Sequence, residues 1–309
     1  MTRPAVLVGA LPFLTTLAAT AAAAAVQAPG PPVFGVQVES VHVDAFVTRA
    51  GRTLRGLSAS DFELKDNGVR QRLDLVAAES RPLMAMLAFD TSLSVAGEKL
   101  AALRTAGEAF LDSMRPEDEI ALLSFSEKIT WRARPTRDRA LLRGALGQLR
   151  PSGSTAALDA LYAGLLLPAA QGRTLVVLFS DGEDNQSWLD HRQLRAAAER
   201  SSALIHVVGL RPADPPVGGQ GLRGLPPEPE HIAALREIAE VTGGHYWEAE
   251  TPERLKHAFA AIANAMGQRY VLRYEPQGAR QPGWHRIELR LRGHKGDVHA
   301  RRGYWVAMR

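Results

Sequence analysis

The sequence places oxygen-bearing side chains at three points where a hard cation could be held. Asp90, Ser92 and Ser94 alternate directly after an apolar run. In an extended stretch, alternating side chains point to the same side, so one carboxylate and two hydroxyls would face one point. Thr155 stands just before a helical pattern, and Asp181 follows a second apolar run. Oxygen ligands of this kind suit Mg²⁺, which binds in a near-octahedral arrangement.

The segment from Asp90 to Ser94 is weak evidence for a metal by itself, because such residues are also common where they cap the start of a helix. Its position strengthens the case. In open parallel sheets, ligands bind at the carboxyl ends of the strands, and both Asp90 and Asp181 follow apolar runs of strand length. The polar residues 183–185 either support the site from behind or simply belong to the loop before the next helix.

The elements that must position these residues alternate along the middle of the chain. Continuous apolar segments, typical of fully buried strands, alternate with amphipathic helix patterns. Strands are predicted at 83–89, 120–125, 174–179 and 203–210, and helices at 98–114, 137–149, 155–167, 190–201, 231–241 and 252–266. This order predicts a Rossmann-like α/β domain over residues 82–267, with a doubly wound, mainly parallel sheet.

The regions on either side of this domain have β patterns. Residues 33–47 alternate apolar and polar side chains, and Asp66-Asn67-Gly68 has the composition of a tight hairpin turn between strands at 61–65 and 69–76. Further strands are predicted at 270–274, 284–291 and 298–306. We expect the β unit at 33–80 to pair with residues 268–309 in a β-sandwich-like module that flanks the α/β domain.

The N-terminus has the layout of a secretory signal peptide over residues 1–28. Arg3 precedes an apolar stretch at 5–26, and Val26-Gln27-Ala28 is a small-residue cleavage pattern. Cleavage predicts an exported protein (periplasmic, cell-surface or secreted) with no integral membrane segment left. The alternative is an uncleaved membrane anchor, since the stretch is nearly long enough to cross a bilayer.

The amino-acid composition excludes several kinds of functional site. The chain has no cysteine, which excludes a thiolate nucleophile and a thiolate zinc site. Its net charge of +4 comes from scattered basic residues, so the sequence does not predict nucleic-acid binding. The nine histidines are dispersed. His206 lies within an apolar run, where a core histidine with satisfied hydrogen bonds is expected. The C-terminal histidines, which include His245 and His299, show no ligand spacing, and a weak metal patch there is the alternative. Packing is the expected role of Trp247.

The five oxygen ligands, in this order and at these strand ends, resemble the metal-ion-dependent adhesion site of von Willebrand factor A-type (VWA) domains. The resemblance covers about residues 82–267. The flanks resemble the bacterial subgroup of such domains first noted in acidobacterial proteins, through Leu57–Gly68, Tyr270–Tyr274 and Arg302-Gly303-Tyr304. Together these segments extend the similarity over nearly the whole mature chain.

This resemblance implies a binding protein rather than an enzyme. Asp90 and Asp181 supply two negative charges, which balance a divalent cation, and the hydroxyl ligands favour Mg²⁺ or Mn²⁺ over Ca²⁺. In such domains a Glu or Asp carboxylate of a protein partner completes the coordination. Specificity would then come from loops around the metal, for which residues 126–136 and 211–230 are the candidates.

Two other functions stay open at this point. A metal-dependent hydrolase would use the same cation to activate water for phosphoester hydrolysis, although the sequence shows neither a positioned base nor a basic clamp for phosphate. A structural module of a cell-envelope assembly would depend little on the metal. Partner binding that EDTA leaves unchanged would refute the adhesion hypothesis, and metal-dependent turnover of a phosphoester that is lost in Asp181→Ala would favour the hydrolase.

Overall fold

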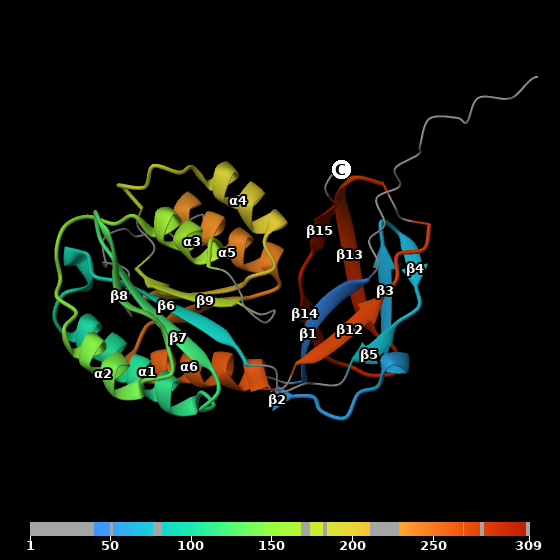
Figure 1. The fold of residues 1–309 in the computed structure, drawn as a ribbon, viewed down its shortest axis with the longest axis horizontal. Helices are drawn as coiled ribbons and strands as arrows, with labels where there is room; N and C mark the ends of the chain where they lie inside the picture. The colour runs from blue at the N-terminus through green and yellow to red at the C-terminus, as the bar shows by residue number, and fades with distance from the viewer. Residues whose placement is uncertain are drawn as a thin grey trace, which may run out of the picture. The chain divides into compact units, whose positions relative to one another are not determined.

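The computed structural model describes residues 40–49, 52–76, 82–167, 174–181, 184–210, 229–267, 269–278 and 281–306. The predicted signal peptide therefore lies outside the described residues. Within the described part of the chain, no helix has the length and apolar character needed to cross a membrane. The described elements form a layered α/β domain and a pair of antiparallel sheets (Figure 1).

A six-stranded sheet forms the centre of the α/β domain, in the order β11-β10-β9-β6-β7-β8. Its strands are β6 (Met84–Asp90), β7 (Glu119–Phe125), β8 (Ile129–Thr136), β9 (Thr174–Ser180), β10 (Leu204–Leu210) and β11 (Tyr246–Ala249). All its pairings are parallel except that of β7 with β8. Strands β6 and β9 are buried at every residue, which explains why their sequences are continuously apolar.

Helices cover both faces of this sheet (Figure 1). One face carries α1 (Glu98–Ser113), α2 (Arg139–Gly147) and α6 (Pro252–Gly267), and the other carries α3 (Ala157–Leu165), α4 (His191–Arg200) and α5 (Glu230–Thr242). On the first face, the Phe179 ring stacks 5.0 Å from Phe89 and 4.3 Å from Phe259. The predicted doubly wound, mainly parallel α/β fold is confirmed.

Two antiparallel sheets combine strands from both flanks of the α/β domain. One has the order β14-β1-β12-β5, with β2 beside β1, and the other has the order β15-β13-β3-β4. The strands are β1 (Val41–Arg49), β2 (Arg52–Thr53), β3 (Phe62–Asp66), β4 (Val69–Gln71), β5 (Asp74–Val76), β12 (Tyr270–Tyr274), β13 (Gly283–Leu291), β14 (Asp297–Ala300) and β15 (Gly303–Val306). Val43, Leu64 and Leu272 share one buried core, so the sheets pack as a sandwich. The fold-class prediction of added β sheets is confirmed.

Two predicted strands are divided in the structure. Residues 69–76 separate into β4 and β5, and residues 298–306 separate into β14 and β15, with the members of each pair in different sheets. The hairpin turn itself forms as predicted: Asn67 and Gly68 have φ angles of 47° and 82°. A strand that passes from one sheet to the other keeps its apolar alternation, and therefore reads as one segment in the sequence.

Two strands of the α/β sheet were missed by the sequence analysis. Residues 129–136, expected as part of a loop near the metal, form β8, an edge strand with irregular register against β7. Most of its residues are exposed or half-buried, so its sequence lacks the apolar run of the central strands. β11 was missed because it has only four residues. Residues 211–228 of the other expected loop lie outside the described residues.

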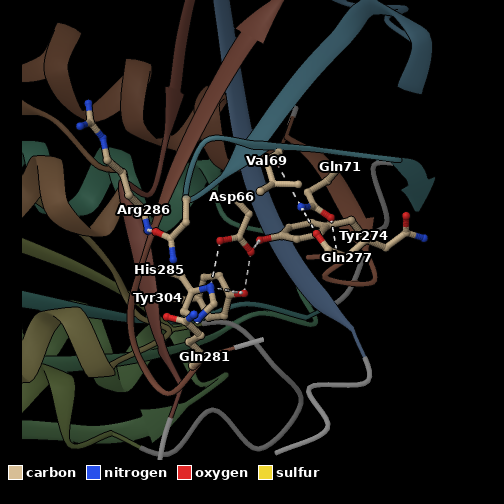
Figure 2. A network of polar contacts seen from close by, with 10 residues as sticks. Asp66, Val69, Gln71, Tyr274, Gln277, Gln281, His285, Arg286 and Tyr304 are labelled. Atoms are coloured by element: carbon tan, nitrogen blue, oxygen red, sulfur yellow. Dashed lines mark hydrogen bonds and ion pairs between the residues drawn. The ribbon is translucent and has the colours of Figure 1, made fainter. Parts of the chain in front are cut away.

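A buried polar network crosses the core of the sandwich (Figure 2). Asp66 Oδ2 accepts hydrogen bonds from the hydroxyls of Tyr274 (2.9 Å) and Tyr304 (2.8 Å). Asp66 Oδ1 lies 2.9 Å from Nδ1 of His285, whose Nε2 lies 2.6 Å from the Gln281 carbonyl oxygen. Burial raises the pKa of both tyrosine hydroxyls, which therefore stay protonated and donate. Full hydrogen bonding offsets the cost of burying the carboxylate.

This network joins the three flanking motifs on which the subgroup resemblance rests. Asp66 comes from the first motif, Tyr274 from the second and Tyr304 from the third. The preceding residue, Gly303, packs against the same network, since a Cβ there would lie 2.3 Å from the His285 carbonyl oxygen. The motifs are therefore explained by the closure of the sandwich rather than by contact with a metal.

Candidate metal centre

The five predicted ligands all lie at the carboxyl edge of the parallel sheet. Asp90 is the last residue of β6, and Asp181 directly follows the neighbouring strand β9. Ser92 and Ser94 lie in the turn after β6, which includes the 3-10 helix η2 (Leu93–Val95). Thr155 lies two residues before α3. Three loops that are far apart in sequence therefore meet at one edge, as expected for a sheet of this type.

Asp90 is held rigidly within this edge. Its side chain is fully buried, and it accepts hydrogen bonds from the Ser92 N–H (2.8 Å) and the Ser180 hydroxyl (2.7 Å). Burial raises the pKa of Asp90, the hydrogen bonds from Ser92 and Ser180 act in the opposite direction, and the charge of Asp181 adds to the rise. A buried carboxylate with these properties is stabilised in its charged form by any cation placed beside it.

Hydrogen bonds between loops position the hydroxyl ligands. The Ser92 and Ser94 hydroxyl oxygens lie 2.9 Å apart. Thr155 is buried; its N–H donates to Asn185 Oδ1 and its carbonyl oxygen accepts from the Asn185 N–H, both at 3.0 Å. Asp184 Oδ2 accepts from the Leu158 N–H in the first turn of α3 at 2.9 Å. Residues 184 and 185 thus hold the Thr155 loop and the helix start.

Asp181 provides the test of whether this set of side chains fits a cation. Its side chain is 10% exposed, and its Oδ1 atom is buried without a hydrogen-bond partner among the described residues. A buried carboxylate oxygen in that position costs free energy, which a bound cation would remove. The donor set, two carboxylates with three hydroxyls, is one that Mg²⁺ or Mn²⁺ accepts. The residues present therefore fit a divalent cation.

Lys99 was not singled out from the sequence. Its Nζ atom lies 3.8 Å from Asp181 Oδ2 and donates to the Ser94 carbonyl oxygen at 3.1 Å. It is in the first turn of α1, where a lysine has no distinguishing pattern. Among the described residues, no group of three or more His, Cys, Asp and Glu side chains is arranged to hold a metal, so a metal here depends on the hydroxyls.

Comparison with known proteins identifies the domain. Residues 85–183 match the sequence model of the von Willebrand factor type A domain. A UPF0353 protein of Mycolicibacterium paratuberculosis is 25% identical over 206 residues, which span 61% of this chain and 62% of that protein, less than two thirds of its length.

One solved structure shows the same fold, and a second is similar in part. A von Willebrand factor type A protein from Catenulispora acidiphila superposes with a TM-score of 0.51 at 14% identity, over 84% of this chain and 76% of that chain. An aerotolerance-related membrane protein from Bacteroides fragilis gives a TM-score of 0.46 at 21% identity, over 60% of this chain and 98% of that chain.

The α/β domain is therefore a von Willebrand factor A-type domain, as the sequence resemblance predicted. This chain carries it together with two antiparallel sheets built from the flanking strands. A domain of this type suggests protein–protein interaction or adhesion.

Proposed function

We propose that this protein binds Mg²⁺ or Mn²⁺ through Asp90, Ser92, Ser94, Thr155 and Asp181, and thereby binds a Glu or Asp side chain of a protein partner. The observation that carries the proposal is the buried Oδ1 of Asp181, which has no hydrogen-bond partner among the described residues and lies near the buried carboxylate of Asp90. Two carboxylates balance a divalent cation, while the hydroxyl ligands are neutral. The bound cation would therefore still attract a carboxylate from outside.

The proposed ligands would have different roles in holding the cation. Asp90, fixed by Ser92 and Ser180, would anchor the cation at the end of β6. The three hydroxyl groups would complete the protein's share of the ligands without adding charge. The predicted signal peptide supports an exported location, where the partner would be an envelope or extracellular protein.

Metal binding is tested by isothermal titration of MgCl₂ and MnCl₂ into the metal-stripped protein. We expect one ion per chain in the wild type and loss of binding in Asp181→Asn. Asp112→Asn is the matched control, since Asp112 lies on α1 with its side chain 63% exposed. Far-UV circular dichroism shows whether the variants fold. Wild-type affinity in a folded Asp181→Asn protein would contradict the assigned site.

Partner binding is tested by capture from a cell-envelope fraction with and without EDTA. We expect the same bound protein to be lost in EDTA and to return with Mg²⁺ or Mn²⁺, and to be absent with Asp181→Asn. Capture that EDTA leaves unchanged would refute a metal-dependent adhesion role. Metal-dependent hydrolysis of para-nitrophenyl phosphate that disappears in Asp181→Asn would instead favour the hydrolase alternative.

A further inference from the structure

A second candidate binding site lies at the amino-terminal ends of β10 and β11, whereas the candidate metal centre lies at the carboxyl ends of β6 and β9. It is a cavity of about 490 Å³. Its walls come from β10, β11 and α6 of the α/β domain and from β1, β2 and β14 of the sandwich. Pockets that hold small organic molecules have volumes of about 300–1,000 Å³. The cavity is therefore large enough for such a ligand.

Two buried N–H groups beside this cavity need an acceptor. His206 Nδ1 accepts a hydrogen bond from the His245 backbone N–H at 3.0 Å, and burial lowers the pKa of His206 to about 3. The ring is therefore neutral near pH 7, with its proton on Nε2. This Nε2–H and the indole Nε1–H of Trp247 are buried without hydrogen-bond partners among the described residues. Because unpaired buried donors are costly, both groups favour a ligand that presents acceptor atoms.

Charged groups of both signs lie around the cavity. The buried Arg269 guanidinium Nη1 lies 3.7 Å from Asp44 Oδ2, and Arg301 also interacts electrostatically with Asp44. Two guanidinium groups thus share one carboxylate. Burial lowers the pKa of His245 and His299, so these rings do not add charge near pH 7. Carboxylates also act on these rings, Asp297 on His299 and Glu240 on His245, so groups of both charges surround the cavity.

Rings line much of the cavity. The Phe46 and His299 centroids lie 6.1 Å apart, and the His245 ring meets Trp247 edge-on at 4.7 Å. Aromatic surfaces of this kind pack well against a flat apolar body. A metal ion is a less suitable occupant of this cavity than an organic ligand, because none of the described histidines belongs to a group arranged to hold a metal.

We propose that this cavity binds a small organic anion of the aromatic carboxylate class. The carboxylate accepts hydrogen bonds from His206 Nε2–H and Trp247 Nε1–H, in a cavity that Arg269 also lines. The ring packs against the aromatic walls. This site does not depend on the proposed metal centre.

The chemical class is tested by isothermal titration of the full chain with three probes of one shape: 2-naphthoate, 2-naphthylmethanol and 2-naphthylmethylammonium. We expect 2-naphthoate to bind once per chain, about tenfold or more tighter than the alcohol, because charged acceptors form the stronger hydrogen bonds. The ammonium probe should not bind. Equal affinities for the three probes would refute an anion site, and no binding of 2-naphthoate at millimolar concentration would refute the aromatic carboxylate class.

The location is tested by variants. Ala261→Phe introduces a ring from the α6 wall and should abolish 2-naphthoate binding, whereas Ala101→Phe, the same change on the exposed face of α1, should leave it unchanged. Trp247→Phe keeps a ring but removes the indole donor, so it should weaken 2-naphthoate about five- to tenfold. Binding that survives Ala261→Phe would contradict the assignment. Binding in EDTA, and in Asp181→Asn, should equal that of the wild type, which separates this test from that of the metal site.

Discussion

Protonation of His206 should make the protein less stable as the pH falls below about 6.5. Its side chain is buried in the α/β domain, where burial and then the neighbouring His245 lower its pKa from 6.5 to about 3. Arg269 and His299 act in the same direction. In the unfolded chain the imidazole titrates near its ordinary pKa. The unfolded state therefore takes up the proton first, and stability is lost between about pH 6.5 and pH 3.

The size of the effect follows from the distance between the two pKa values. Each pH unit in this window costs about 1.4 kcal/mol for one group. A pH of about 5.0 lies about 1.5 units below the pKa of the imidazole in the unfolded chain, which is therefore mostly protonated. In the folded protein the ring is still neutral at this pH. His206 should therefore remove about 2 kcal/mol of unfolding free energy between about pH 7.5 and pH 5.0.

Urea unfolding followed by circular dichroism at the two pH values measures this loss. Other groups also titrate in this range, so the comparison is with His206→Gln, whose side-chain oxygen can still accept the His245 N–H. The wild type should lose about 2 kcal/mol more than the variant over the same interval. Equal losses in the two proteins would show that His206 does not stay neutral in the folded state, and would refute the reasoning.

Three substitutions test the packing, each by the urea midpoint at neutral pH. Gly244→Ala would place a Cβ 1.7 Å from the Ile205 carbonyl oxygen, so we expect poor folding or a loss of about 3 kcal/mol or more. Tyr304→Phe removes a donor to buried Asp66 and should cost about 1.5–3 kcal/mol. Phe179→Ala opens a cavity beneath α1 and α6 and should cost about 3–5 kcal/mol. A wild-type midpoint in any of them would contradict the corresponding contact.

Much of the α/β fold could be predicted because its signals are local. β6 and β9 are apolar at nearly every position, since both faces of the sheet are covered. β8 could not be predicted in the same way, because an edge strand is half-solvated and lacks that run. The turn at Asn67-Gly68 was readable because its positive φ angles restrict the residue types.

The candidate metal centre, like the fold, could be predicted from the sequence only in part. Asp90, Ser92 and Ser94 are close in sequence, and the hydroxyls of Ser92 and Ser94 do lie together, but in a turn with a 3-10 helix rather than in the extended stretch that the alternation implied. The partners of these residues could be predicted only in part. Asn185, which holds Thr155, belongs to the polar residues 183–185 that the sequence offered as support for the site. Ser180, which donates to Asp90, and Lys99, which lies beside Asp181, have no local pattern that marks them.

The sequence by itself therefore determined the class of domain and the strand ends that carry the oxygen-bearing side chains, and it predicted the type of cation that these side chains suit. Only the tertiary structure decided which distant residues meet: Asp66 with Tyr304 in the sandwich, and His206 with His245 beside the cavity. The physical reason is that periodicity records whether a side chain is buried, but not what it is buried against. That second property depends on sheet order and on how the sandwich closes, which are set by packing along the whole chain.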